Sequence, residues 1–191
     1  MSTRALIVVD VQPTFCEGGE LGVDGGNRVA ADVAAYAAAH RDRYGLVVTT
    51  QDWHIDPGEH FSDAPDFVSS WPVHGVAESP NAALHPVLAD LDADVAIRKG
   101  QYDDGYSGFD GTDPVGRSLD QVLREAAVDT VDVVGLAESH CVKHTALDAV
   151  RHGFATRVLT DLTAPVSAEQ GEQARSEMAA VGVELTRSSA G

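Results

Sequence analysis

The stretch ALIVVD, residues 5–10, indicates the fold class. Its five apolar residues run without a polar interruption, a pattern typical of a strand buried on both faces of a parallel sheet. Short β-rich runs predict further strands at Leu46–Asp52, Val95–Lys99, Thr130–Gly135, Thr156–Leu159 and Val183–Thr186. Because helical patterns separate these runs, the sequence predicts a parallel sheet with helices on both faces.

The helices are expected at about Asn27–Arg43, Ser118–Ala127, Cys141–Gly153 and from Ser167 onward. Asn27 is the expected N-cap of the first helix. Two others begin with a serine that a glutamine follows three residues later, the pattern of a capping box. The segment Trp53–Pro86 holds five of the eight prolines. Because it is too long for a plain connection, we expect it to be functional.

Composition limits the possible partners and compartments. The 191 residues fit a single domain, 1–191, with a net charge of −17. This charge argues against nucleic acid or an anionic membrane surface as a partner. The apolar run near the N-terminus is too short to span a bilayer and has no cleavage signal, so we expect a cytoplasmic protein with reduced cysteines. A monomer or small homo-oligomer is expected.

Reactive side chains fall at the ends of successive predicted strands. Asp10, Asp52 and Lys99 end the first three strands, and Cys141 follows the fourth across a short turn. Open parallel sheets bind ligands outside the carboxyl ends of their strands. The coincidence of four such residues therefore predicts an active site at this edge of the sheet.

These residue types suit nucleophilic catalysis. The start of a helix is expected to lower the pKa of the Cys141 thiol. Asp10 could accept the thiol proton, and the Lys99 ammonium could stabilise the anion. The alternatives are a buried structural cysteine, a solvated lysine and an aspartate that caps a loop.

A second group of residues indicates a metal site. Asp52 and His54 are two positions apart, so in an extended segment both side chains point the same way. His60 and His74 follow in the proline-rich segment. Carboxylate and imidazole ligands without thiolate suit one divalent ion of zinc, iron or manganese. The alternative is a loop of exposed histidines.

Several blocks in order carry a family resemblance. They are IVVDVQPTFCEGGEL from Ile7, QDWHIDPGEHFS from Gln51, SSWPVHG from Ser69, RKGQYDDGYSGFDG from Arg98, VDVVGLAESHCVKHTALDAVRHG from Val131 and ATRVLTDLTAPVSAE from Ala155. Over nearly its whole length the chain resembles the nicotinamidases (pyrazinamidases) of the isochorismatase-like cysteine hydrolases, especially the actinobacterial ones. The resemblance implies a three-layer α/β/α, Rossmann-like hydrolase fold with a six-stranded parallel sheet.

The resemblance also implies residue roles for hydrolysis of a nicotinamide-like amide to the acid and ammonia. It implies a catalytic triad of Asp10, Lys99 and Cys141, and a cis peptide bond at Leu136–Ala137 with an oxyanion hole from the N–H groups of Ala137 and Cys141. It implies metal ligands Asp52, His54, His60 and His74, with the ring nitrogen of the substrate reaching the metal. The implied ring contacts are Phe15, Trp71 and Tyr106; their alternative role is ordinary core packing.

Two segments depart from the family pattern. Glu138-Ser139 stands where Thr-Asp is usual, and Pro13-Thr14 stands where Asn-Asp is usual. Both lie beside the expected pocket, so they bear on substrate choice more than on reaction class. The alternatives are a hydrolase of the same fold for another small amide, ureido compound or isochorismatase-type substrate, a metal-bound hydroxide as the nucleophile, and an inactive binding protein.

Overall fold

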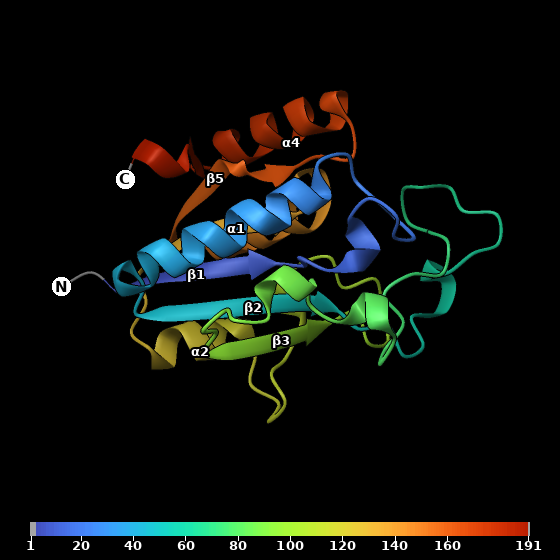
Figure 1. The fold of residues 1–191 in the computed structure, drawn as a ribbon, viewed down its shortest axis with the longest axis horizontal. Coiled ribbons are helices and arrows are strands. Elements are labelled where there is room, and N and C mark those ends of the chain that lie inside the picture. The colour runs from blue at the N-terminus through green and yellow to red at the C-terminus, as the bar shows by residue number, and fades with distance from the viewer. Residues whose placement is uncertain (1–2, 191) are drawn as a thin grey trace.

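The computed structural model describes residues 3–190. Within this range six parallel strands form one sheet in the order β3-β2-β1-β4-β5-β6 (Figure 1). The strands are β1 (Arg4–Val9), β2 (Leu46–Asp52), β3 (Val95–Lys99), β4 (Thr130–Leu136), β5 (Ala155–Ala164) and β6 (Glu184–Thr186). The helices are α1 (Gly26–His40), α2 (Leu119–Glu125), α3 (Lys143–Arg151) and α4 (Ala168–Ala180). None of these helices has the length and apolar character needed to cross a membrane.

Alternation along β1 divides the core into two layers. Leu6 and Val8 pack in the same core as Val29 and Val33 of α1. Ile7, on the opposite face, belongs to the core formed with α2, α3 and α4. The sheet is therefore covered on both faces, and the predicted three-layer α/β/α fold is confirmed (Figure 1).

The start of α1 differs from the prediction. The N-cap is Gly25, with φ of 82°, and a glycine has no side chain that could cap the helix. The carboxylate of Glu17 instead accepts the backbone N–H groups of Gly25 and Asn27, each at 2.7 Å. Asn27 is therefore not the cap, because a carboxylate ten residues earlier already satisfies the exposed N–H groups. The two predicted capping serines, Ser118 and Ser167, are confirmed.

The helix predicted from Cys141 begins later. A π-helical turn at Glu138–Val142 precedes α3, so Cys141 lies in this turn. The strand predicted at Thr156–Leu159 is longer in the structure, because β5 continues past a register shift opposite Val133–Gly135 of β4.

The strand order reverses direction between β1 and β4. From β1 the chain proceeds outward through β2 and β3 on one side, and then returns to β4 on the other. Ligands of open parallel sheets bind at such a reversal, outside the carboxyl ends of the strands. Asp10 follows β1 and the π-helical turn follows β4, so both lie beside this crevice.

Candidate active site and metal centre

The structure brings Asp10, Lys99 and Cys141 together. Lys99 Nζ lies 2.8 Å from Asp10 Oδ2 and 3.6 Å from Cys141 Sγ. All three side chains are buried. Thr50 Oγ1 also donates to Asp10 Oδ1 at 2.6 Å, a contact that sequence analysis did not anticipate. The three residues come from the ends of β1, β3 and β4, as their positions at strand ends indicated.

The backbone at Asp10 has an unusual conformation. Its φ is 45°, in the left-handed region that residues other than glycine rarely adopt. Its N–H donates to the Thr50 carbonyl oxygen at 3.2 Å. Such conformations cost free energy and are concentrated at functional sites. Here the conformation ends β1 and accompanies the placement of the carboxylate beside Lys99.

Burial controls the protonation of the three groups. Burial raises the pKa of Asp10, and Lys99 opposes this only in part. Burial likewise raises the pKa of the Cys141 thiol well above its usual value, although Lys99 acts in the other direction. For Lys99, burial alone would lower the pKa, but the Asp10 and Asp52 carboxylates raise it well above its usual range.

The expected lowering of the Cys141 pKa is therefore wrong, because burial outweighs the nearby ammonium of Lys99. A neutral thiol beside a carboxylate of raised pKa suits proton transfer at the moment of attack better than a permanent thiolate does. The carboxylate is a stronger base than an ordinary aspartate, and the ammonium can stabilise the sulfur anion once it forms.

Lys99 also links the two groups of residues that the sequence suggested separately. Its Nζ donates to Asp52 Oδ1 as well as contacting Asp10. Burial would raise the pKa of Asp52, but Lys99 and His54 hold it below its usual value. The side chain of Gln12 forms two hydrogen bonds with the backbone of Asp52. Its Oε1 accepts the Asp52 N–H at 2.9 Å, and its Nε2 donates to the Asp52 carbonyl oxygen at 3.0 Å.

Three histidines from the proline-rich segment converge beside Asp52. The Nδ1 atoms of His54, His60 and His74 pair with the carbonyl oxygens of Gly100 (2.5 Å), Ser69 (3.3 Å) and Pro72 (2.8 Å), respectively. A carbonyl can only accept, so each Nδ1 carries a hydrogen, and a histidine of this tautomer has its Nε2 lone pair available for a metal. Burial lowers the pKa of His60, and it lowers the pKa of His74 to about 4.

This donor set fits a divalent metal. One ligand atom from each histidine lies within 4.8 Å of those of the other two. Asp52 Oδ2 is 3.6 Å from His54 Nε2 and 3.8 Å from His74 Nε2. Among residues 3–190, the buried His54 Nε2 has no hydrogen-bond partner. A buried nitrogen left with a free lone pair is costly unless something binds it, and imidazole suits zinc, iron or manganese.

Gly100 permits the close approach of His54. A Cβ at this position would lie 2.6 Å from His54 Cε1, and the glycine φ is +66°. A larger residue would displace the ring and strain the backbone. The turn after β3 therefore positions both Lys99 and the ring of His54.

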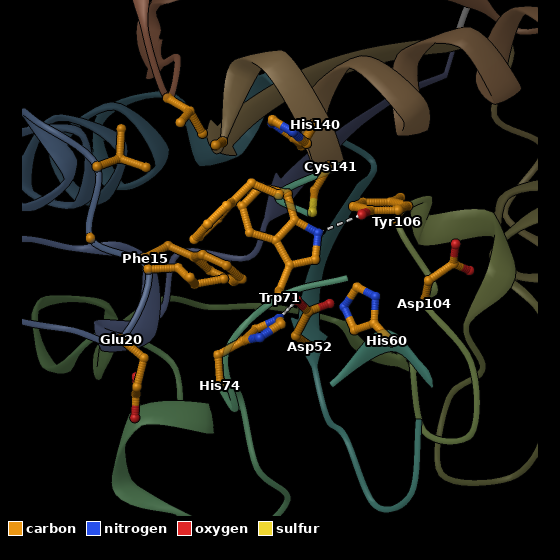
Figure 2. Close-up of a pocket in the computed structure, with 16 residues that line it drawn as sticks. Phe15, Glu20, Asp52, His60, Trp71, His74, Asp104, Tyr106, His140 and Cys141 are labelled. Atoms are coloured by element: carbon orange, nitrogen blue, oxygen red, sulfur yellow. Dashed lines mark hydrogen bonds and ion pairs between the residues drawn. The ribbon is translucent and has the colours of Figure 1, made fainter. Parts of the chain in front are cut away.

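A cavity of about 250 Å³ is lined by Cys141 and, from the proposed metal site, by Asp52, His60 and His74 (Figure 2). Phe15, Trp71 and Tyr106, the three aromatic residues that the resemblance implied, line it. Trp71 Nε1 donates to the Tyr106 hydroxyl at 2.8 Å, which joins two walls of the cavity (Figure 2). Its other lining residues are Glu20, Leu21, Gly22, Val23, Phe67, Asp104, Ala137, His140 and Val166.

Several of these lining residues were not identified from the sequence, among them Phe67, Asp104, His140 and Val166. His140 immediately precedes Cys141, and its position beside the nucleophile was the only available signal. The others lie in loops whose course the sequence pattern does not predict.

The turn that carries Cys141 follows a cis peptide bond between Leu136 and Ala137, as the resemblance implied. The Ala137 carbonyl oxygen accepts the N–H groups of His140 at 3.1 Å and Val142 at 3.2 Å. Ala137 and Cys141 both line the cavity. Their backbone N–H groups are therefore candidates for an oxyanion hole at the cavity wall.

Comparison with known proteins agrees with this geometry. The family model described as an isochorismatase domain matches residues 4–190. The chain belongs to the isochorismatase family. A curated nicotinamidase/pyrazinamidase of Mycobacterium tuberculosis is 53% identical to it over 186 residues, covering 97% of this chain and 100% of the relative.

Solved structures of isochorismatase-type proteins share the fold. The L. infantum PnC1 protein in complex with nicotinate superposes with a TM-score of 0.85 at 34% identity, covering 99% of this chain and 94% of that one. The Pyrococcus horikoshii pyrazinamidase in complex with zinc has a TM-score of 0.80 at 33% identity, covering 96% of this chain and 98% of that one.

The departures of this isochorismatase-family chain from the usual pattern lie outside the cavity lining. Glu138 and Ser139 are buried in the π-helical turn but do not line the cavity that the described residues form. Thr14 Oγ1 accepts the N–H of Gly75, which follows His74, at 3.2 Å, and it donates to Glu20 Oε2 at 2.5 Å. Thr14 therefore supports the loop that carries His74.

Proposed function

We propose that this protein hydrolyses the carboxamide of nicotinamide, releasing nicotinate and ammonia. One observation carries the proposal. Lys99 contacts both Asp10 and the Cys141 thiol, and this thiol lies at the wall of a ring-sized cavity that histidines of the cluster also line. The high identity to a nicotinamidase/pyrazinamidase supports the same reaction. Nicotinate production would place the protein in NAD salvage in the cytoplasm, where the two free cysteines would stay reduced.

In the proposed mechanism, Asp10 removes the proton from Cys141 Sγ as the sulfur attacks the carboxamide carbon. The N–H groups of Ala137 and Cys141 stabilise the resulting oxyanion. Asp10 returns the proton to the departing ammonia when the C–N bond breaks, leaving a thioester. Water then attacks the thioester and gives a proton to Asp10. When the C–S bond breaks, Asp10 returns that proton to the Cys141 sulfur, so the acid leaves and the thiol is regenerated. Lys99 stabilises the sulfur anion in both steps.

Phe15, Trp71 and Tyr106 would enclose the ring of the substrate. Asp52, His54, His60 and His74 would hold one divalent ion of zinc, iron or manganese, which would supply a Lewis acid beside the ring of the substrate. The buried Lys99 contacts both Asp52, a proposed metal ligand, and Cys141. One side chain therefore connects the proposed metal site with the reacting thiol.

The basic test is ammonia release from nicotinamide by the purified protein, with elemental analysis of the same sample. We expect turnover and one bound transition metal per chain. If the protein binds metal but releases no ammonia from nicotinamide, the proposed function is wrong.

His60→Ala should weaken metal binding by at least about tenfold, because even loss of a partner that only orients a ligand has effects of that size. The measurement is a competition titration with a chromophoric chelator. His152→Ala is the matched control, since His152 pairs with Asp120 and stacks on Phe109 outside the cluster. Equal metal affinity in the two variants would exclude His60 as a ligand.

A second candidate is hydrolysis of another small amide. Away from the proposed metal ligands, the cavity lining includes the carboxylates of Glu20 and Asp104, and no lysine or arginine of the described residues lines it. This charge favours uncharged substrates, because bringing like charges together is unfavourable. We therefore expect kcat/KM for nicotinamide to exceed that for the anionic amide maleamate by at least about tenfold, or 1.4 kcal/mol. A preference for maleamate would favour the second candidate.

A further inference from the structure

Glu138 is a buried carboxylate that the proposed mechanism does not use. It begins the π-helical turn that carries Cys141, and its side chain is fully buried. Its Oε2 accepts a hydrogen bond from the hydroxyl of Thr163, near the end of β5. Its Oε1 lies 2.8 Å from Nη2 of Arg175 in α4. The carboxylate therefore joins the nucleophile's turn to two other elements.

The surrounding packing is built around this carboxylate. Gly171 of α4 faces it, and a Cβ at this glycine would lie 2.9 Å from Pro165 and 3.4 Å from Glu138 Oε1. The absence of a side chain at Gly171 thus lets α4 approach the turn closely. Arg175, one helical turn further along α4, reaches Glu138 while its side chain stays 42% exposed.

The next residue forms a second link on the same side. Ser139 Oγ accepts the N–H of Val166 at 3.1 Å and pairs with His140 Nδ1 at 3.0 Å. Glu138 is thus hydrogen-bonded to Thr163 and ion-paired with Arg175, and Ser139 is hydrogen-bonded to Val166. The following two, His140 and Cys141, line the cavity (Figure 2).

Taking a carboxylate out of water is unfavourable unless it is well paired, and apolar packing often serves stability as well as a buried ion pair does. We propose that Glu138, paired with Arg175 and Thr163, is a positioning residue that fixes the π-helical turn. The fixed turn keeps Cys141 Sγ beside Lys99 and keeps the backbone N–H of Cys141 facing the cavity. This inference rests on the proposed function, because it assigns Glu138 a part in that reaction.

The expected effect is on turnover. A shift of about 1 Å in a reacting group can reduce the rate about 100-fold. We expect Glu138→Ala to lower kcat by at least about tenfold while KM changes less than about twofold, because Glu138 does not touch the cavity. Glu138→Gln keeps the size and the acceptor oxygen, and it should retain most of the native kcat.

Arg175→Met tests the pairing from the more exposed side. Alone it leaves Glu138 charged and buried without its partner, so kcat should fall as in Glu138→Ala. Combined with Glu138→Gln it leaves no buried charge, so the double variant should have a higher kcat than Arg175→Met alone. Equal kcat in these two variants would contradict a role for the ion pair.

The closing experiment measures the rate at which iodoacetamide alkylates Cys141, read by mass spectrometry, together with kcat and Tm. Asp132→Asn is the matched control. Asp132 is fully buried in β4 and accepts two hydrogen bonds from Arg157, each at 2.7 Å. It lies near the opposite end of the strand that leads to Cys141.

We expect Asp132→Asn to lower Tm without changing kcat or the rate of Cys141 alkylation. Glu138→Ala and Arg175→Met should lower both kcat and the rate of alkylation. If these two variants lose only Tm, as the control does, the positioning role is wrong. Alkylation needs no substrate, so it decides the question even if the native protein does not hydrolyse nicotinamide. If Glu138→Ala does not fold, Arg175→Met and its double variant decide it by the same two rates.

Discussion

Replacing Cys141 with alanine is expected to lower ammonia release from nicotinamide by at least about 10⁴-fold, the scale of loss when a catalytic nucleophile is removed. The thioester cannot form without Sγ, and no other described cysteine lines the cavity. The fold should persist, because the change removes only one buried sulfur atom. Ammonia release and circular dichroism of the purified variant measure the two outcomes.

Cys16→Ala is the control for this prediction. Cys16 is buried in the same core as Phe15, and burial raises the pKa of its thiol to about 11. It does not line the cavity, so activity should stay within about twofold of the native value. If Cys141→Ala kept native activity, the covalent mechanism would be wrong and a metal-bound hydroxide would become the better candidate. Detection of a Cys141 thioester by mass spectrometry would exclude that alternative directly.

Replacing Lys99 with methionine is expected to lower both activity and stability. The buried ammonium contacts Asp10 and Asp52, so its loss removes the positive charge that both carboxylates share. Breaking a buried ion pair in this way costs about 3–5 kcal/mol of the free energy of unfolding. The rate of hydrolysis should fall by about 10²–10³-fold, the usual effect of removing one group that stabilises a reacting anion. Urea denaturation and steady-state kinetics measure the two effects.

Lys143→Met is the matched control, because Lys143 is the only other lysine of the chain. It pairs with Glu177 at 2.9 Å, and its side chain is 17% exposed while that of Glu177 is 39% exposed. Loss of such a partly solvated pair should cost no more than about 1 kcal/mol. Similar losses in both lysine variants would show that Lys99 has no special place in the site.

Much of the fold and of the site could be predicted from the sequence. The bounds of β2 and β3 are those predicted, because each begins with a short apolar run, Leu-Val-Val in β2 and Val-Ala-Ile in β3, and continues into polar residues at the carboxyl end. The predicted strand ends also placed Asp10, Lys99 and Cys141 on one edge. Their convergence required only that parallel strands end at the same side of a sheet.

Other features could not be predicted, because they depend on contacts between distant segments. The sequence indicates that Asp52 lies at the active edge and suits a metal, but not that its carboxylate also accepts a hydrogen bond from Lys99. The pKa of Cys141 was expected to be lowered, whereas burial raises it. Asn27 was the expected cap of α1, but Glu17 supplies the capping carboxylate from another loop.

Local sequence patterns are enough to predict the parallel α/β architecture and the residue types at its active edge, because apolar runs and strand ends are local properties of the chain. Which of these groups meet depends on the folded arrangement. In the folded chain Lys99 contacts both Asp10 and Asp52, and one ring nitrogen from each of three histidines lies close to the other two. Folding also pairs Glu138 with Arg175. The physical reason is that charge pairing and burial act between groups close in space, and sequence separation does not report that closeness.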